Sequence, residues 1–308
     1  MRLRLNVLVL IVLLVFVPET TFCGWWIVER SEDRYGNFSS QSVFIQGQKL
    51  RVESATSSFI FDLENEEVCL VFPKQTIYWK GNGDTLRNRF LLNIEHQMRM
   101  MIEQIPQYER EKALPELEKM LSDLKAGDID TAMIQKISFK AMDSTSSICG
   151  FLSSKFQVVF DTTVIEETWI SSEIMPYSGI SLKKLNKMMR LFSRPTVFAA
   201  VRESDGWTQL MQGGLMTKSI VYTSLGRNTT QVTQVKEVNV RDEFFMPPPD
   251  YRAVSADEVV GIMLGENIGM PELKSRENTD EWKPILPTIP KKTDAYQMPV
   301  SNPPELPD

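Results

Sequence analysis

The side chains that could perform catalysis are few in this sequence, and their spacing argues against an enzyme. His96 is the only histidine among 308 residues, and a hydrolytic triad most often depends on a histidine base. His96 follows Ile94 by two positions in a helical pattern, so it points about 200° away from the apolar stripe, onto a solvated polar face. A zinc site is also disfavoured, because cysteine and histidine are too few and too scattered.

Two pairs of adjacent carboxylates, Glu66-Glu67 and Glu166-Glu167, are the remaining candidates for acid–base chemistry. Neighbouring residues of a strand point to opposite faces of the sheet, so neither pair converges on a substrate. We therefore interpret both pairs as solvated residues of sheet edges and turns. Since no glycine-rich phosphate loop is present either, the sequence predicts no catalytic residue, no cofactor site and no metal site.

Methionine is the residue type that most favours a binding function here. Its flexible thioether side chain fills irregular spaces and adapts to varied ligands. The chain has 16 methionines, several of them within helical patterns, while two tryptophans lie in strand patterns. The residues expected to bind a ligand are Trp79, Phe90, Met98, Met101, Trp169 and Met188. The pattern is equally compatible with helices packed permanently on a solid core.

A sheet near the N-terminus must position these residues. A first strand is predicted at 24–33, and from Gln41 to Lys80 apolar and polar residues alternate with a period of two, as at Leu50 and Val52. Turn-forming residues separate the alternating runs. The pattern predicts an antiparallel meander whose apolar face must be covered by the rest of the chain.

Helical periodicity follows the meander. Apolar residues recur every three or four positions over 86–105, and a second helix is predicted at about 108–125. Asp84 is a suitable N-cap for the first helix, and Pro115 is expected to kink or restart the second. The sequence therefore predicts a helical insert at about 84–126.

Strand and helix patterns alternate over the remainder. Strands are expected from about 134, as a hairpin over 147–171 and as a second hairpin over 215–241 that turns at 226–228; helices are expected at 181–192 and 256–264. The segment 196–201 fits either a helix or a strand. The composition becomes rich in proline and charge beyond 271, which is typical of an extended or disordered tail.

The N-terminus has the composition of a secretory signal. Arg2 and Arg4 precede an apolar run at 5–17 that is short for a membrane span. Cleavage after Cys23 would make Gly24 the first mature residue; the alternatives are an uncleaved anchor and lipidation of Cys23. We expect an extracytoplasmic location, in the periplasm or cell envelope.

Export also bears on the other two cysteines, Cys69 and Cys149. An oxidising compartment permits a disulfide between them, although two buried thiols in sheet strands are the favoured alternative. The net charge of −6 argues against nucleic acid as a partner.

The order of these elements resembles the LolA/LolB outer-membrane lipoprotein carrier superfamily, in an exported bacterial branch. The stretches that carry the resemblance are Lys49-Leu50-Arg51-Val52-Glu53, Phe61-Asp62, Ile77-Tyr78-Trp79, Ile148-Cys149-Gly150-Phe151, Phe156-Gln157-Val158, Glu167-Thr168-Trp169-Ile170 and Phe245-Met246-Pro247 with Tyr251. The resemblance covers about 24–252. It transfers no functional residue: Arg51 lies on an early strand, as does an arginine of the carriers, but its surroundings differ.

The resemblance implies an α+β fold, a curved antiparallel half-open β-barrel whose concave face is covered by helices, followed by a short helix and the proline-rich tail at 253–308. It also implies a non-enzymatic protein that holds a lipid or a lipoprotein acyl chain in the concavity. The alternative is an envelope protein-interaction or structural module with a solid core, which would contact its partner through the tail or an edge strand.

Overall fold

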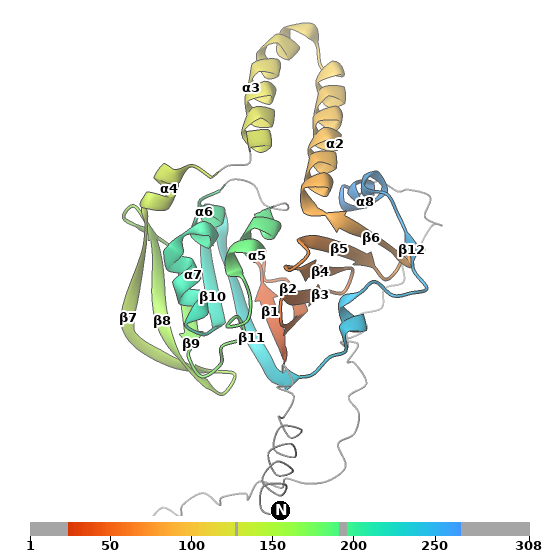
Figure 1. The fold of residues 1–308 in the computed structure, drawn as a ribbon. Helices are drawn as coiled ribbons and strands as arrows, with labels where there is room; N and C mark the ends of the chain where they lie inside the picture. The colour runs from red at the N-terminus through yellow and green to blue at the C-terminus, as the bar shows by residue number, and fades with distance from the viewer. Residues whose placement is uncertain (1–23, 127–128, 191–195, 266–308) are drawn as a thin grey trace, which may run out of the picture.

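The structure, a computed structural model, describes residues 24–126, 129–190 and 196–265. The expected signal segment and the expected proline-rich tail beyond 271 lie outside the described residues. The fold is α+β, with one curved sheet of 12 strands and helices on its concave side (Figure 1). This is the fold class that the sequence predicts.

The sheet is built almost entirely from neighbours in sequence. Its strands are β1 (Gly24–Glu32), β2 (Phe38–Gln46), β3 (Lys49–Glu53), β4 (Ser58–Asp62), β5 (Glu67–Phe72), β6 (Ile77–Asn82), β7 (Ile137–Ile148), β8 (Phe151–Phe160), β9 (Thr163–Ser171), β10 (Leu215–Thr223), β11 (Gly226–Val238) and β12 (Arg252–Ala253). The spatial order is β12-β6-β5-β4-β3-β2-β1-β11-β10-β9-β8-β7. Because β12 and β7 lie at opposite edges, the sheet curves without closing.

Strand pairing is antiparallel except where β12 runs parallel to β6. The predicted meander is confirmed: Leu50 on β3 pairs with Phe61 on β4, which pairs with Val68 on β5. Cross-strand pairing of apolar side chains on the same face fixes this register, because a slip of one residue would turn the whole set to the other face.

Both faces of the meander are buried, although the alternation predicted one apolar face. On the convex side, Trp26, Phe44, Ile60 and Val71 form a second hydrophobic cluster. The segment after β11 covers this cluster, with its 3-10 helix η2 (Asp242–Phe245) seated over the sheet. The proline-containing segment therefore interrupts the sheet pairing between β11 and β12, while Phe245 and Tyr251 on either side of the prolines contribute to this cluster.

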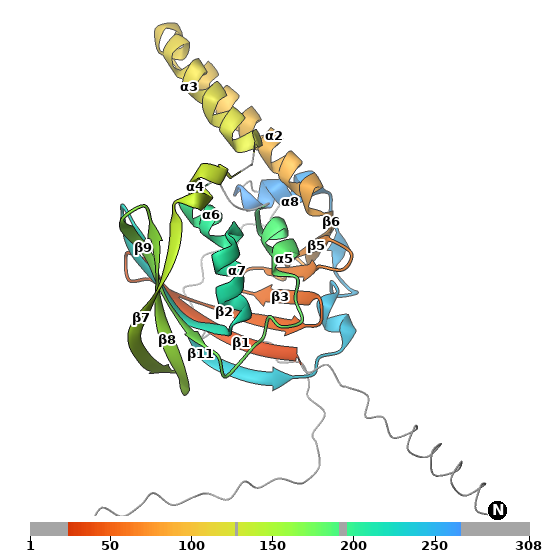
Figure 2. The same ribbon diagram turned by 60° about the vertical axis from the view of Figure 1, so that its left-hand side comes forward.

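Three short helices lie inside the curve of the sheet (Figure 2). They are α5 (Leu182–Met189), α6 (Val197–Glu203) and α7 (Asp205–Gln212). Ser181, Thr196 and Ser204 cap their N-termini with side-chain oxygens that accept backbone N–H groups. The ambiguous segment at 196–201 is thus helical, and α7 is a helix that the sequence patterns did not predict.

The helical insert extends away from the sheet. Helices α2 (Gly83–Glu103) and α3 (Gln107–Ala126) form a hairpin, here called the arm, that projects beyond the rest of the fold (Figures 1 and 2). At 21 residues, α2 is about 30 Å long. Helix α3 continues through Pro115. Helix α8 (Ala256–Met263) packs against the base of α2 and buries Val259 and Val260 in the main core.

Several expected boundaries are wrong by a few residues. A short helix, α4 (Thr131–Gln135), occupies the place where a strand was expected from about 134, and the strand β7 begins after it. The turn between β7 and β8 lies at Cys149-Gly150, where both residues have positive φ. The last hairpin turns at 224–225 rather than at 226–228.

The N-cap of α2 is Asn82 rather than the expected Asp84. The Asn82 side-chain oxygen accepts the backbone N–H of Asp84. We expect Asn82→Ala to lower the free energy of unfolding by about 1 kcal/mol, because one orphan N–H loses its partner. Urea unfolding checks this value. Asn82→Asp should retain most of the stability, and an equal loss in both variants would contradict the capping role.

Candidate functional site

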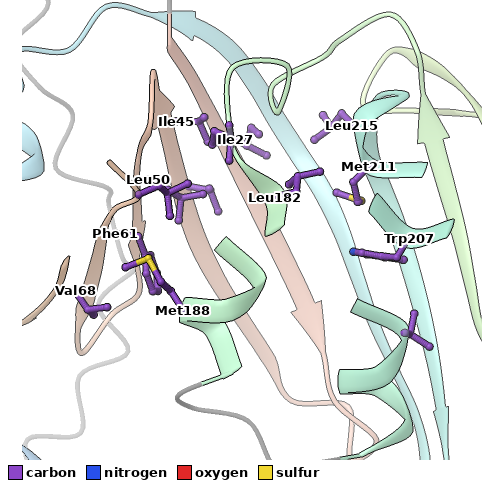
Figure 3. Packing of buried hydrophobic residues seen from close by; sticks show 14 of the residues in the cluster. Ile27, Ile45, Leu50, Phe61, Val68, Leu182, Met188, Trp207, Met211 and Leu215 are labelled. Atoms are coloured by element: carbon purple, nitrogen blue, oxygen red, sulfur yellow. The ribbon is translucent and has the colours of Figure 1, made fainter. Parts of the chain in front are cut away.

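The concave face of the sheet carries a large hydrophobic cluster. Side chains of the meander, such as Ile27, Leu50 and Phe61, meet Leu182 and Met188 from α5 (Figure 3). Trp207 and Met211 from α7 approach the same face next to Leu215. The described side chains are therefore packed together where the sequence predicted a ligand-binding concavity.

Two of the expected binding residues belong to this cluster. Trp79 and Met188 are both buried in it, and Phe90 packs against it from the base of α2. Trp169 lies on the opposite face of the sheet, where the ammonium groups of Lys155 and Lys218 each lie 5.1 Å from its ring centroid. The aromatic ring is thus held between two cations.

The other two expected residues, Met98 and Met101, lie on the projecting part of α2. The structure therefore does not gather the expected residues into one site. The helical stripe of α2 was expected to cover the sheet, but of the stripe residues only Leu86 and Phe90 reach the main core. Beyond Phe90, the apolar stripe continues along the projecting arm.

The arm exposes large apolar side chains to solvent. Met101 is 67% exposed and Met100 is 46% exposed. Leu92, Tyr108 and Met120 are also exposed on the same hairpin. In helices that only pack against one another, such apolar residues are expected to be buried, and exposed positions are expected to be polar. The arm therefore presents several large apolar side chains to solvent among its charged residues.

Charged groups hold the base of the arm together. Glu95 on α2 accepts hydrogen bonds from Lys125 on α3, at 2.6 Å, and from Arg99, at 2.9 Å. These two hydrogen bonds, the one from Lys125 first, lower the pKa of Glu95 below its usual value. With Glu118, Leu121 and Ser122, these groups line a solvent-open pocket of about 520 Å³ between the helices.

Glu166 is not solvated, in contrast to the interpretation from sequence. It is fully buried on β9, and its carboxylate lies 3.0 Å from the guanidinium of Arg202 on α6. Ser219 on β10 donates a hydrogen bond to Glu166 Oε1 at 2.7 Å. The Arg202 guanidinium also stacks on Trp207, 3.7 Å from the ring centroid. This ion pair fastens α6 and α7 to the sheet.

Glu167 faces the other side of the sheet, as the alternation predicts. It is half-buried and lies 2.7 Å from Lys155, and it accepts hydrogen bonds from Gln157 and Tyr222. Burial by itself would raise the pKa of Glu167, but the hydrogen bonds from these three residues outweigh it and lower the pKa. The two adjacent carboxylates therefore do not converge on one reaction centre.

A third acidic side chain, Glu29 on β1, faces the concave side. Glu29 Oε2 accepts a hydrogen bond of 2.7 Å from Gln41 on β2. Burial raises the pKa of Glu29 above its ordinary value, and the hydrogen bond from Gln41 only partly opposes this. Tyr177, in the loop before α5, packs against the main cluster, and burial followed by the negative charge of Glu29 raises the pKa of its hydroxyl.

The arginine on the early strand has a structural role. Arg51 lies on the convex face, 2.7 Å from Glu53, with its guanidinium 4.5 Å from the ring centroid of Phe244. It therefore holds the segment around η2 against the sheet rather than contacting the helices of the concave face.

The two cysteines within the described residues are both free, so the possibility of a disulfide between Cys69 and Cys149 is wrong for this structure. Cys69 is buried in the convex cluster, and this burial raises its pKa to about 12. Cys149 is half-buried in the turn after β7. Because its pKa is so high, the Cys69 thiol stays protonated and unreactive.

Among the residues that the structure describes, no three His, Cys, Asp or Glu side chains lie close enough together to hold a metal ion. None of the helices in the described ranges is long and apolar enough to cross a membrane.

Comparison with known proteins shows similarity only to solved structures. No family model matches the sequence, and no curated protein matches it. PNGF-II in its C2 crystal form shares 12% identity and a TM-score of 0.34, covering 77% of this chain and 32% of PNGF-II. This chain thus spans about a third of that protein.

Two other solved structures are similar to this chain at equally low identity. MucB in complex with MucA(peri) shares 9% identity and a TM-score of 0.34, covering 76% of this chain and 58% of MucB; a related structure names Pseudomonas aeruginosa as the source. A putative outer membrane lipoprotein-sorting protein domain from Vibrio parahaemolyticus shares 8% identity and a TM-score of 0.25, covering 74% and 91%. Similarity at this level does not assign the chain to a family.

Sequence patterns missed Glu29 and Arg202, and they placed Glu166 wrongly in solvent. An acidic residue in an alternating strand gives no signal of which face is buried. Arg202 lies just beyond a segment that fitted helix and strand equally, so its partner could not be inferred. The one sequence signal for a buried polar group was the number of polar residues in strands β9 and β10, because strands that bury a fully apolar face carry few of them.

Proposed function

We propose that this protein is an exported, non-enzymatic binding protein for an apolar ligand, a lipid or a lipoprotein acyl chain, and that the arm formed by α2 and α3 captures that ligand. The proposal keeps the ligand class expected from sequence. It assigns ligand binding to methionines on the arm rather than to methionines on the concave face.

The exposed apolar surface of the arm is the observation that carries the proposal. Met100 and Met101 are adjacent near the end of α2, and Tyr108 follows at the start of α3. Each is solvent-exposed, so contact with an acyl chain would remove apolar area from water at about 25 cal/mol per Å². Methionine suits this role because its unbranched side chain adapts to a chain of varying shape.

The charge distribution of the arm favours binding of an uncharged apolar ligand over binding to an anionic membrane. Arg99 and Lys125 are both engaged with Glu95, and Arg110 donates to the backbone carbonyl of Glu103. Attraction to anionic lipid headgroups requires clustered basic side chains that are free to meet them. The arm is therefore better suited to a single acyl chain than to a charged bilayer.

A double substitution on the arm tests the proposal. We expect Met100→Gln with Met101→Gln to weaken binding of a pyrene-labelled long-chain alcohol about tenfold, because two apolar contacts are lost. Glutamine retains the helix propensity and the approximate volume of methionine. Fluorescence titration of the purified protein measures the change.

Met246→Gln provides the matched control, since Met246 is 54% exposed but lies at the end of η2, away from the arm. The control should bind the alcohol as the wild type does. Both variants should unfold within about 0.5 kcal/mol of the wild type. Equal weakening in the arm variant and the control would overturn the role of the arm.

The non-enzymatic part of the proposal is supported by the carboxylates. Glu166 is engaged by Arg202 and Ser219, and Glu167 by Lys155 on the opposite face. Neither is presented to a substrate with a second catalytic group. The proposed export to the periplasm or cell envelope rests on the signal-like N-terminal sequence alone.

An exposed edge strand favours a second function, that of an envelope protein-interaction module. Strand β7 forms one edge of the sheet, most of its residues are exposed, and its pairing with β8 is interrupted between Ala141 and Thr145. A free edge can add a strand from another protein. Hydrogen exchange separates the two functions: a protein partner would protect the β7 amides, whereas an acyl ligand on the arm would leave them unchanged.

A further inference from the structure

Two neighbouring hairpin turns carry large exposed side chains at one end of the sheet. The turn between β1 and β2 exposes Tyr35 at 73% and leads to Phe38, which is 58% exposed. The turn between β10 and β11 exposes Leu225 at 69%. The two segments, 33–38 and 222–228, are here called the tip.

The two turns of the tip are in contact. The backbone N–H of Arg34 donates a hydrogen bond of 3.1 Å to the side-chain oxygen of Asn228. A Cβ added at Gly226 would lie 3.0 Å from the Cβ of Arg34. Strands β1 and β11, which lead to the two turns, also pair with each other as far as Glu32 and Thr229. The exposed side chains of the two turns therefore belong to one surface.

Three exposed arginines accompany these apolar side chains. The guanidinium of Arg30 lies 3.9 Å from the ring centroid of Phe38, and that of Arg34 lies 4.6 Å from the ring centroid of Tyr35. Arg227 follows Gly226 at the start of β11. None of the three is ion-paired with a carboxylate of the described residues. Their positive charges are thus available to a partner, unlike the charges at the base of the arm.

The backbone of the first turn is fully hydrogen-bonded within the protein. The N–H groups of Tyr35 and Asn37 both donate to Asp33 Oδ1. Asp33 N–H donates to Asn37 O, Gly36 N–H donates to Asp33 O, and Arg34 N–H is engaged by the second turn. A polar backbone group that leaves water without a partner is costly. This turn can therefore enter an apolar layer without losing a hydrogen bond of its N–H groups.

We propose that the tip docks on a phospholipid bilayer, with its exposed aromatic and leucine side chains in the interface and the three arginines against the phosphate groups. Aromatic side chains are favoured at the level of the headgroups. The planar guanidinium of arginine matches a phosphate with two parallel hydrogen bonds. The surface goes beyond the proposed function, since it involves neither the arm nor the ligand that the arm captures.

Charge and hydrogen bonding favour a bilayer over a protein as the occupant. A specific protein interface carries about one hydrogen bond per 100–200 Å², whereas the N–H groups of the first turn are already engaged. Two carboxylates lie near the arginines. That of Asp33 is bound by the N–H groups of its own turn, and Glu32 is exposed on β1. The excess of positive charge faces an anionic leaflet favourably.

A tryptophan placed on the tip tests the proposal in the full chain. Leu225→Trp would be mixed with vesicles of phosphatidylcholine with brominated acyl chains, which quench tryptophan, and phosphatidylglycerol. We expect the fluorescence of the added tryptophan to be quenched, because it would lie in the bilayer interface. Leu152→Trp is the matched control: Leu152 is 60% exposed on β8 beside the turn with β7, and its added fluorescence should be unchanged. The six native tryptophans are a common background.

The arginines are tested in the Leu225→Trp protein. We expect Arg30→Gln with Arg227→Gln to raise the lipid concentration for half-maximal quenching about tenfold, because two cations near an anionic surface are lost. Lys74→Gln with Lys119→Gln removes two exposed cations outside the tip and should leave this concentration unchanged. Thermal unfolding at the same temperature in all these variants verifies that they are folded.

Two results would overturn the proposal. One is quenching at position 225 that is no stronger than at position 152. The other is equal titrations for the two pairs of charge substitutions. If the tip is not quenched, but an elution volume that depends on protein concentration becomes constant in Tyr35→Ser with Leu225→Ser, the surface is a contact between two copies of the chain instead. In every case the pyrene-labelled alcohol reports separately on the arm.

Discussion

Replacing Arg202 by methionine is expected to lower the free energy of unfolding by about 3–5 kcal/mol, because it leaves a buried carboxylate without its partner. Glu166 is 0% exposed, whereas the Arg202 side chain is 33% exposed. Removing the arginine therefore leaves the more deeply buried charge, that of Glu166, without an ion-pair partner. Ser219 would remain as one hydrogen-bond donor and would not neutralise it.

The opposite substitution should cost less. In Glu166→Gln the stranded charge is the guanidinium of Arg202, which water reaches in part and which still stacks on Trp207. Combining Glu166→Gln with Arg202→Met should recover most of the stability lost in Arg202→Met, since replacement of both partners of a buried ion pair is often close to neutral. The double-mutant cycle measures this coupling directly.

Lys136→Met serves as the control for this cycle. Lys136 and Asp161 form an exposed ion pair at 3.7 Å, and such pairs contribute about 0–1 kcal/mol. Denaturant unfolding of the five proteins (wild type, the two single variants, the double variant and the control), with circular dichroism as the signal, gives the free energies. A loss in Arg202→Met no larger than that in Lys136→Met would contradict the role of the buried pair in fastening α6 and α7.

Replacing Trp79 by alanine is expected to lower the free energy of unfolding by about 3–5 kcal/mol, as for other aromatic residues in packed cores. Trp79 lies on β6 opposite Leu70 and is buried in the main cluster. A tryptophan that merely lined a ligand cavity would cost much less to remove. The measurement therefore distinguishes a core residue from the binding residue that the sequence suggested.

Gly81 provides an internal check on the position of Trp79. A Cβ added at Gly81 would lie 2.8 Å from Cζ2 of the Trp79 ring. We expect Gly81→Ala to cost about 1–3 kcal/mol through overpacking, and most of that cost should vanish in the Trp79→Ala background. Tyr35→Ala, at an exposed turn residue, should change stability by no more than about 0.5 kcal/mol. Additive losses at Gly81 and Trp79 would contradict the contact.

Period-two alternation was sufficient to predict the meander, because apolar pairs such as Leu50 and Phe61 must share a face. The curvature of the sheet was expected only from the family resemblance. It could not predict that the convex face would also be buried. That depended on the segment around η2 returning over Trp26 and Phe44. Phe44 and Phe244, whose rings are in contact, lie 200 positions apart along the chain.

Helical periodicity predicted α2 and α3 but not their direction. An apolar stripe on a helix requires a packing partner but does not specify which one. The stripe of α2 meets the main core at Leu86, and helices α8 and α3 pack against α2. The remainder is exposed as the arm, where Met101 lies, while Met188 on α5 is buried. The expected binding residues are therefore divided among the main core, the projecting arm and, for Trp169, the opposite face of the sheet.

The central claim is that this protein carries an apolar ligand, and native mass spectrometry tests it most directly. The protein would be purified without detergent from the cells that express it, weighed intact, and then extracted for lipids. We expect an added mass that the extraction identifies as an acyl-chain compound, and a smaller bound fraction for the Met100→Gln, Met101→Gln variant. An unliganded protein that also takes up none of the pyrene-labelled alcohol would contradict the account.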